Sequence, residues 1–376
     1  MSEAIYLDWN ATAKVRPEAI AVMTAVMQRV GNPSSIHAAG RRARAVLDTA
    51  RSQAAELVGA SPEALTVTSG GTEASALAIT SAVASGLQRI IVGATEHDCV
   101  RAGAEATGLP VSVWPVDHDG VANLGWLAEE LGTGGPALVC LMLTNNETGV
   151  IQPVPEAAAL VRAAGGRLHV DAVQAAGKLP IRFDDLSADT LAISAHKLGG
   201  PQGVGALIAG PRATLVRLQH GGGQERGRRG GTENLPGIAG FGAAALAAKR
   251  DLTALAAQAP WRDALAALMI EHGAIVLGRG AARLPQTLCI ATPGFASDMQ
   301  VMTLDLAGVM ISAGAACSSG KVKSSLVIEA MGLPDLAPFG VRISGGWDTN
   351  EADWRQCGEA WALAHARYFE RRREFA

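Results

Sequence analysis

One lysine of the chain stands where its amine could act as a nucleophile. The stretch 190–210 begins with a short apolar run, continues through Ser194, His196 and Lys197, and reaches a second apolar run after a glycine-rich turn. This pattern predicts a strand, a tight loop and a second strand, with Lys197 at the end of the first strand. Partial burial and neighbouring cations lower the pKa of a lysine, so that its amine can form an imine with an aldehyde. Taken alone, the stretch fits a surface lysine in a hairpin equally well.

Two further polar motifs follow predicted strands. The segment T-S-G-G-T-E (68–73) opens a predicted helix, and free backbone N–H groups at a helix N-terminus favour a phosphate. The segment H-V-D-A-V-Q (169–174) places Asp171 at the end of a strand, where a carboxylate could keep a pyridinium nitrogen protonated. An ordinary helix cap is the alternative for each segment, provided by Thr72 in the first and by Asp171 in the second.

His97, in T-E-H-D-C-V (95–100), and Asn146, in L-T-N-N-E-T-G (143–149), also follow predicted strands. A lone histidine is more often structural than catalytic, but one stacked on a cofactor ring could move protons, because its unperturbed pKa is about 6.5. Ligands of open parallel sheets bind along the edge where the carboxyl ends of the strands meet. Together with Lys197, these motifs predict a pyridoxal phosphate site at that edge.

The apolar runs that position these motifs predict an α/β fold with a mostly parallel, seven-stranded sheet covered on both faces. Strands are expected at residues 65–68, 89–93, 111–116, 137–143, 167–170, 190–194 and 204–209. Helices are expected from Pro17 through Val30 and from Ile36 to Gly59. After about Ala239 the pattern changes to helices rich in alanine and leucine, with shorter strands near 286–291 and 309–312. These features predict a smaller α+β domain, onto which an extended arm, residues 1–16, packs.

A chain of 376 residues is too long for one ordinary hydrophobic core, which predicts two domains. We expect residues 13–245 to form a large cofactor-binding domain, and residues 1–12 and 246–376 to form the small domain. The formal net charge of −3 gives no general attraction to nucleic acid or to membranes.

The N-terminus lacks the features of a signal peptide, and no run reaches the roughly 18 apolar residues of a membrane span. The five cysteines are an odd number and are widely scattered, which argues against a disulfide framework and against a zinc site. We therefore expect a cytoplasmic protein that binds no metal, no membrane and no nucleic acid.

These motifs resemble those of the cysteine desulfurases of the NifS/IscS type, in the class V aminotransferase group of fold-type I pyridoxal-phosphate enzymes. The resemblance runs from Y-L-D-W-N-A-T (6–12) to V-R-I-S (341–344), which is nearly the whole chain. Its most specific segments, besides those quoted above, are G-N-P-S-S (31–35), S-A-H-K (194–197) and G-G-G-Q-E-R-G-R-R-G-G-T (221–232).

The resemblance implies roles for individual residues around pyridoxal 5′-phosphate. Lys197 holds the cofactor covalently, His97 stacks on its ring and assists proton transfer, and Asp171 pairs with the ring nitrogen. Contacts to the ring oxygen or to the substrate come from Gln174 and Asn146, and contacts to the phosphate come from Gly71, Thr72, Ser194 and His196. Thr232 reaches the phosphate of the partner subunit, which implies a homodimer. The substrate carboxylate is bound by Arg342 and Asn32, since a guanidinium fork suits that group.

One cysteine distinguishes a desulfurase from its relatives. Cys317 lies in S-A-G-A-A-C-S-S-G (312–320), among residues that make a loop mobile and leave a thiol accessible. The other cysteines, Cys99, Cys140, Cys289 and Cys357, fit small buried side chains. The resemblance therefore implies that L-cysteine is converted to L-alanine and that the sulfur remains on Cys317 as a persulfide. A sulfur-acceptor protein, such as an iron–sulfur scaffold or a sulfur carrier, then receives it.

Three alternatives compete with this interpretation. An aminotransferase or a selenocysteine lyase would share every cofactor residue but would not need Cys317 in the same way. A sulfur-delivery platform would mainly bind an acceptor protein and turn over slowly. A nucleic-acid-binding protein is opposed by the acidic net charge and by the absence of interleaved aromatic and basic residues.

Overall fold

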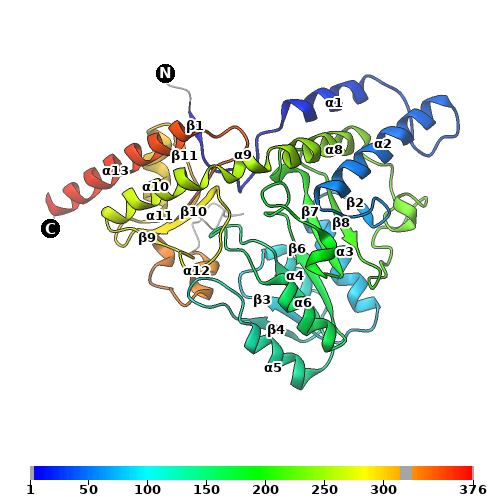
Figure 1. Ribbon diagram of the computed structural model, residues 1–376, viewed down its shortest axis with the longest axis horizontal. Helices are drawn as coiled ribbons and strands as arrows, with labels where there is room; N and C mark the ends of the chain where they lie inside the picture. The colour runs from blue at the N-terminus through cyan, green and yellow to red at the C-terminus, as the bar shows by residue number, and fades with distance from the viewer. Residues whose placement is uncertain (1–3, 314–323, 375–376) are drawn as a thin grey trace.

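A computed structural model of the chain describes residues 4–313 and 324–374; one large sheet and two small sheets carry the helices (Figure 1). The large sheet consists of β2 (Leu65–Thr68), β3 (Ile90–Gly93), β4 (Val111–Trp114), β5 (Leu138–Met142), β6 (Arg167–Asp171), β7 (Thr190–Ser194) and β8 (Gly205–Ala209). Its strand order is β2-β8-β7-β6-β5-β3-β4. Strand β8 runs in the direction opposite to the other six strands. The predicted mostly parallel, seven-stranded sheet is confirmed.

The helices surround this sheet and extend over the small ones. They are α1 (Pro17–Met27), α2 (Ala38–Leu57), α3 (Gly71–Ala84), α4 (Asp98–Glu105), α5 (Leu124–Gly134), α6 (Val154–Ala163), α7 (Phe183–Leu186), α8 (Leu235–Arg250), α9 (Leu252–Ala256), α10 (Ala259–Glu271), α11 (Ser297–Leu306), α12 (Leu326–Ala330) and α13 (Glu351–Glu374). Short 3₁₀ turns lie at Ala195–Lys197, Glu225–Gly227 and Ala337–Phe339. Within the described residues, none of the helices is both long and apolar enough to span a bilayer.

Alternate residues of each central strand face opposite layers of helices. In β5, Val139 and Leu141 belong to the largest hydrophobic core, to which α2, α5, α6 and α8 contribute. Their neighbours Leu138 and Cys140 pack instead in the core formed with α3 and α4. Because side chains alternate along a strand, a strand covered on both faces is apolar throughout, which is why these strands appear in the sequence as continuous apolar runs.

The two small sheets are formed by strands of the C-terminal part of the chain together with the N-terminal strand. Three antiparallel strands have the order β12-β10-β9, formed by Gly340–Ser344, Thr287–Ala291 and Ile275–Val276. A second, parallel pair joins β1 (Ile5–Tyr6) to β11 (Val309–Met310), which confirms that the N-terminal arm packs onto a later part of the chain. The arm then continues past the turn after β7, where the Ala13 N–H donates to the His196 carbonyl over 2.8 Å.

Several local expectations and alternatives differ from the structure. Helix α1 ends at Met27 rather than at Val30. Thr72 does not cap α3, because the helix begins at Gly71 and Gly70, with no side chain, is the N-cap residue. No helix follows Asp171; the chain there forms consecutive turns. The domain boundaries at residues 12 and 245 remain predictions.

Candidate active site

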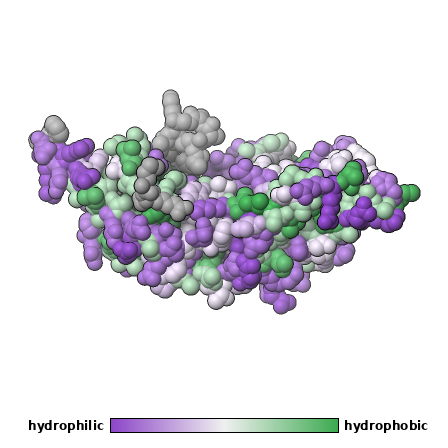
Figure 2. Space-filling model, turned by 90° about the horizontal axis from the view of Figure 1, so that it is seen from above, coloured by the Kyte–Doolittle hydropathy of each residue, from purple (hydrophilic) through white to green (hydrophobic). Residues whose placement is uncertain are grey.

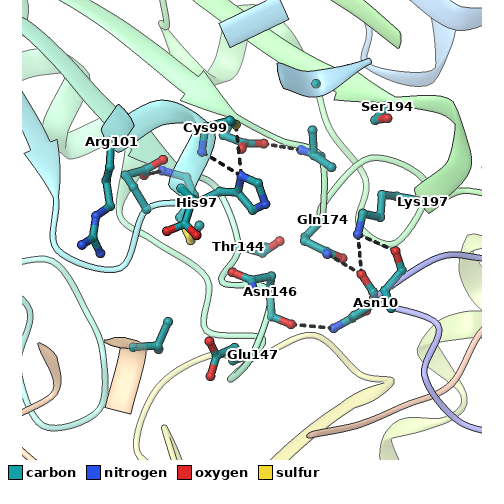
Figure 3. Close-up of a pocket in the computed structure, with 18 of the residues that line it drawn as sticks. Asn10, His97, Cys99, Arg101, Thr144, Asn146, Glu147, Gln174, Ser194 and Lys197 are labelled. Carbon is teal, nitrogen blue, oxygen red and sulfur yellow. Dashed lines mark hydrogen bonds between the residues drawn. The ribbon is translucent and has the colours of Figure 1, made fainter. Parts of the chain in front are cut away.

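A cavity of about 890 Å³ opens where the carboxyl ends of β3, β5, β6 and β7 meet the N-terminus of α3 (Figure 3). These strands are parallel, so the loops that follow them lie at the same edge of the sheet. Polar residues far apart in sequence therefore come together there. Among the residues lining the cavity are most of those predicted for the site: Gly71, Thr72, His97, Asn146, Asp171, Gln174, Ser194, His196, Lys197 and Arg342.

The amine of Lys197 rests on main-chain carbonyls of the N-terminal arm. Its Nζ donates to the Asn10 oxygen over 2.6 Å and to the Ala11 oxygen over 2.8 Å. Burial, and then the nearby guanidinium of Arg342, lowers the pKa of Lys197 to about 8. About a tenth of the amine is then uncharged at pH 7, far more than for an ordinary lysine. The amine is therefore available as a nucleophile and as a proton acceptor.

The N-terminus of α3 forms the anion-binding end of the cavity. Its first N–H groups have no helical partner, and no side chain caps them. A Cβ atom on Gly205 would lie 2.7 Å from the Gly70 backbone, so the glycine in β8 allows this turn to approach the sheet. The hydroxyl groups of Thr72 and Ser194 line the same region. Free N–H groups, two hydroxyls and the positive end of a helix dipole suit a phosphate.

Asp171 ends β6 inside the cavity with only 7% of its surface exposed. Its Oδ1 accepts a hydrogen bond from the Val173 N–H over 2.9 Å. Burial raises the pKa of Asp171, while the Val173 N–H, His97 and Lys197 act in the opposite direction. A carboxyl group with raised proton affinity that lines a cavity is suited to share a proton with a ring nitrogen of a ligand.

The ring of His97 has one defined tautomer. Its Nδ1 accepts from the backbone N–H of Cys99 over 3.1 Å and lies 3.0 Å from the Cys99 sulfur (Figure 3). Since Nδ1 accepts, the neutral ring carries its proton on Nε2. Burial raises the pKa of the Cys99 thiol to about 12, so the thiol stays protonated. Cys99 lines the cavity and is not fully buried. Cys140, Cys289 and Cys357 are buried, as predicted.

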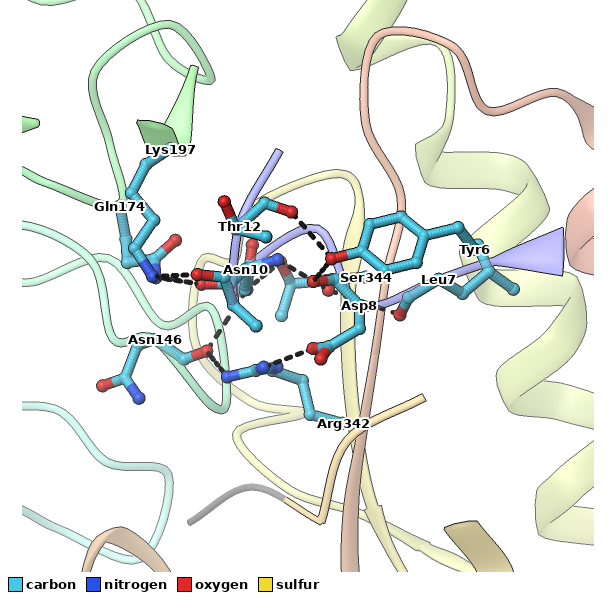
Figure 4. A network of polar contacts seen from close by, with 12 residues as sticks. Tyr6, Leu7, Asp8, Asn10, Thr12, Asn146, Gln174, Lys197, Arg342 and Ser344 are labelled. Carbon is cyan, nitrogen blue, oxygen red and sulfur yellow. Dashed lines mark hydrogen bonds and ion pairs between the residues drawn. The ribbon is translucent and has the colours of Figure 1, made fainter. Parts of the chain in front are cut away.

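Arg342 enters from β12 and is almost entirely buried, at 2% exposure. Its Nη2 donates to Asp8 Oδ1 over 2.6 Å, and its Nη1 donates to the Asn146 carbonyl over 3.1 Å (Figure 4). Its Nε is buried and has no partner among the described residues. The guanidinium is thus held in place from two sides, while its Nε–H remains available for a further acceptor.

Two residues predicted for the site lie elsewhere, and a third is outside the described residues. Asn32 and Thr232 are exposed, and neither is among the described residues that line the cavity. Asn32 instead closes its own turn, with Oδ1 accepting from the Ser34 N–H over 2.8 Å. Cys317 lies outside the described residues. The roles of these three residues remain predictions.

Sequence reasoning missed several polar residues of the site. Asn10 reaches the site from the N-terminal arm and is 1% exposed. Lys178, in the turns after β6, donates to the side chain of Asn10. Glu96 and Glu147 lie in the wall of the site, and burial raises the pKa of both carboxyl groups. Glu147 accepts from the hydroxyl of Ser325, the N-cap of α12, over 2.6 Å. Asn10, Glu96 and Glu147 lie within quoted motifs, and Lys178 follows one by four residues; these positions were the available signal.

The cavity fits pyridoxal phosphate in the chemistry of its donors and acceptors. The uncapped α3 N-terminus is matched to a phosphate, and the Lys197 amine to an aldehyde. Asp171 is matched to the ring nitrogen. In addition, Thr144 Oγ1 is buried in the cavity wall without a partner among the described residues, so a polar ligand can use it.

Comparison with known proteins gives consistent matches. The sequence model of the aminotransferase class-V family matches residues 5–353. A cysteine desulfurase of Cereibacter sphaeroides is 42% identical over 360 residues, which cover 92% of either chain. A cysteine desulfurase of Frankia sp. is also 42% identical, covering 96% of this chain and 91% of that protein.

Solved structures agree with these matches. A NifS-like protein from Rickettsia africae superposes with a TM-score of 0.89 at 29% identity, covering 97% of this chain and all of the other. A structure described as SspA in complex with cysteine superposes with a TM-score of 0.78 at 28% identity, covering 90% of this chain and 98% of the other.

Proposed function

The chain belongs to the aminotransferase class-V family as one of its cysteine desulfurases, and on this premise we propose how its own residues convert L-cysteine to L-alanine, leaving the sulfur on Cys317. The cofactor of this family is pyridoxal 5′-phosphate. When bound, it supplies an electron sink for the bond that breaks at the substrate α-carbon. The observation that carries the proposal is the cavity, which brings the Lys197 amine, the Asp171 carboxyl and the uncapped α3 N-terminus together.

Residues of the cavity would hold the cofactor at its phosphate and at its ring. The backbone of Gly71 with Thr72, Ser194 and His196 would bind the phosphate. Burial, followed by Lys197 and Lys178, lowers the pKa of His196 to about 4, so this imidazole would contribute as a neutral hydrogen-bonding group. Asp171 would pair with the ring nitrogen, and His97 would stack on the ring. Gln174 and Asn146 supply amide groups to the ring oxygen or to the substrate.

Substrate carboxylate binds to Arg342. Asp8 and the Asn146 carbonyl fix the guanidinium, which therefore loses little conformational freedom when a carboxylate arrives. The unpartnered Nε supports this assignment, because a buried donor without a partner gains most from an incoming acceptor. We propose that Asn32 is the second carboxylate ligand.

Proton movement at the α-carbon is assigned to Lys197 and His97. The lowered pKa of Lys197 allows its amine to take a proton near neutral pH and to return it. The His97 ring, with Nε2 protonated in its neutral form, can donate from the side that is not engaged by Cys99.

Cys317 is proposed as the sulfur acceptor. Its thiolate attacks the substrate sulfur, a sulfur–sulfur bond forms, and the carbon–sulfur bond breaks. The electron pair of that bond stays with the three-carbon fragment, which is protonated and leaves as L-alanine. A sulfur-acceptor protein, an iron–sulfur scaffold or a sulfur carrier, would then receive the persulfide sulfur by attack of a thiolate.

A homodimer is proposed as the active form, with Thr232 reaching the phosphate in the partner subunit. The exposed position of Thr232, away from its own cavity, supports this. Large apolar side chains are also exposed along α1 and after it, and Val30 and Ile36 have 89% and 91% of their surface exposed. Apolar surface is visible at the end of the molecule formed by the α1–α2 connection (Figure 2). Such surface is typical of an interface.

The cytoplasm is the proposed location. Four cysteines of the described residues are free thiols, which suits a reducing compartment.

The purified protein loaded with cofactor should produce L-alanine from L-cysteine without any keto acid, and should release sulfide when a thiol reductant is present. An aminotransferase would instead require the keto acid, and a selenocysteine lyase would produce alanine from L-selenocysteine but not from L-cysteine. Quantifying alanine with each substrate, with and without pyruvate, separates the three. Absence of alanine from L-cysteine would reject the proposal.

A further inference from the structure

A second lysine lies directly behind the site and is more deeply buried than Lys197. Lys178 follows β6 in the turns that also carry Gln174, and only 7% of its surface is exposed. Its Nζ donates to Gln174 Oε1 over 2.6 Å and to Asn10 Oδ1 over 2.8 Å. Lysines are seldom buried this deeply, because removing the ammonium from water is costly.

The two oxygens bound by Lys178 determine the direction of two carboxamides. A carboxamide has one accepting end and one donating end, and the amine of Lys178 donates to the accepting end of each. The donating end of Gln174, Nε2, is therefore turned to the Asn10 main-chain oxygen, 2.9 Å away. The donating end of Asn10, Nδ2, is turned to the Asn146 carbonyl at 3.2 Å and to Thr287 Oγ1 at 3.1 Å.

These bonds lead directly to the catalytic lysine. The Asn10 main-chain oxygen, which accepts from Gln174, also accepts from Lys197 (Figure 4). The Asn146 carbonyl, which accepts from Asn10, also accepts from Arg342. One hydrogen-bonded network thus joins Lys178, which is not among the described residues lining the cavity, to Lys197 and to Arg342.

The protonation of Lys178 agrees with this arrangement. Burial, and then the cations Lys197 and Arg342, lowers the pKa of Lys178 well below its usual value. A neutral amine has two N–H groups, and two oxygens lie within 2.8 Å of Nζ. The uncharged form therefore satisfies both acceptors and leaves no N–H unpaired.

We propose that Lys178 is a positioning residue: it fixes the carboxamides of Gln174 and Asn10 so that the donating end of Gln174 is turned to the Asn10 main-chain oxygen, which also accepts from the amine of Lys197. This inference rests on the proposed function, in which Lys197 and Gln174 meet the cofactor. Without Lys178 the Gln174 carboxamide can rotate, its accepting end can turn toward the cofactor, and a hydrogen bond to the ring is lost.

The test is the affinity of the apoprotein for pyridoxal phosphate, followed by absorbance or fluorescence without any turnover. Lys178→Met keeps the apolar stem and removes both hydrogen bonds. We expect its dissociation constant to rise about tenfold, the loss typical of a hydrogen bond to the ligand that is no longer made. The matched control is Lys249→Met, which removes an exposed lysine paired with Glu56, and it should bind like the unsubstituted protein.

A double variant distinguishes positioning from a general loss of stability. If Lys178 acts through Gln174, Lys178→Met should weaken binding little further in a Gln174→Ala background. A purely structural role would give losses that multiply in full. Binding within twofold of the unsubstituted protein, or full multiplication of the two losses, would overturn the proposal.

Folding of each apoprotein is checked by thermal unfolding. Should Lys178→Met not fold, Lys178→Gln replaces it in the same measurements. Its amide nitrogen carries two N–H groups on a shorter side chain, so we expect one of the two hydrogen bonds to be kept and about a threefold loss of affinity; unchanged affinity would again overturn the proposal. Failure of the proposed function would be recognised separately, as absence of alanine production by the unsubstituted protein.

Discussion

The amine of Lys197 is reactive because burial and a neighbouring cation, Arg342, lower its pKa. Its hydrogen bonds to Asn10 and Ala11 keep it at the cavity wall without an acidic partner in direct contact, so the charges of Asp8 and Asp171 raise its pKa less than burial and Arg342 lower it. In contrast, Asp8 binds Arg342, so the cation that disfavours a charged Lys197 is itself held by a carboxylate. The residues that bind the Lys197 amine, and the Arg342–Asp8 pair beside it, all lie more than a hundred positions away from Lys197 in the sequence.

The lowered pKa of Lys197 predicts how the rate of cofactor capture depends on pH. Only the uncharged amine attacks the aldehyde, so the rate at which apoprotein captures pyridoxal phosphate should rise as pH increases through about 8 and then level off. An ordinary lysine would continue to gain rate up to about pH 10. Stopped-flow absorbance from pH 6.5 to 10 gives the midpoint. A midpoint near 10, or capture by Lys197→Ala at a comparable rate, would contradict the assignment.

At the scale of elements, strands were the most predictable part of the chain. The predicted strands 65–68 and 190–194 coincide with β2 and β7, because both are short, fully buried runs rich in apolar and β-branched residues. The turns after β6 were less predictable, since Asp171 bonds to the Val173 N–H without starting a helix. Lys178 and Asn10 could not be predicted as partners, because 168 residues separate them and only the tertiary fold brings them together.

The same strand β6 carries a histidine whose ionisation should affect stability. His169 is fully buried between Thr190 Oγ1, at 2.9 Å, and Ser75 Oγ, at 3.2 Å. Burial lowers its pKa from the usual 6.5 to about 4. Between these values the unfolded chain binds a proton that the folded chain does not, so the stability that His169 provides above pH 6.5 is lost as pH falls toward 4.

Urea unfolding of the apoprotein tests this effect. From pH 7 to pH 5, the free energy of unfolding should decrease by about 2 kcal/mol more for the unsubstituted protein than for His169→Gln, which cannot titrate. Other titrating groups are common to both proteins and cancel in the comparison. Equal decreases would show that His169 is not held neutral in the folded state.

At the scale of the whole molecule, the arm of residues 5–13 joins the small sheets to the active site. It pairs with β11 at Ile5, bridges to Ser344 at Asp8, and reaches the turn before Lys197 at Ala13. We propose that residues 13–245 form the large domain and that residues 1–12 and 246–376 form the small domain. Separate hydrophobic cores, one containing β5 and β7 and the other containing β10 and β12, support this division.

The proposed dimer predicts complementation between two inactive variants. Lys197→Ala and Thr232→Ala subunits are mixed, and the heterodimers are isolated with two affinity tags. If Thr232 acts on the partner, one site carries both substitutions and the other is entirely unsubstituted. Heterodimers should then bind cofactor with normal affinity at half of their sites. If every site of the heterodimer were impaired, Thr232 would act within its own subunit; normal affinity of the Thr232→Ala homodimer would show that it does not act at all.

The proposed sulfur chemistry is tested most directly by the fate of sulfur in Cys317→Ala, with Cys140→Ala, a buried thiol outside the cavity, as the control. Each protein is loaded with cofactor and given L-cysteine; alanine is quantified and the intact protein is weighed by mass spectrometry. We predict that Cys317→Ala binds cofactor and changes its absorbance with L-cysteine, but gains no added sulfur and makes no alanine. Cys140→Ala should gain one sulfur atom and produce alanine near the unsubstituted rate. Normal alanine production by Cys317→Ala would contradict the account and favour a lyase or an aminotransferase.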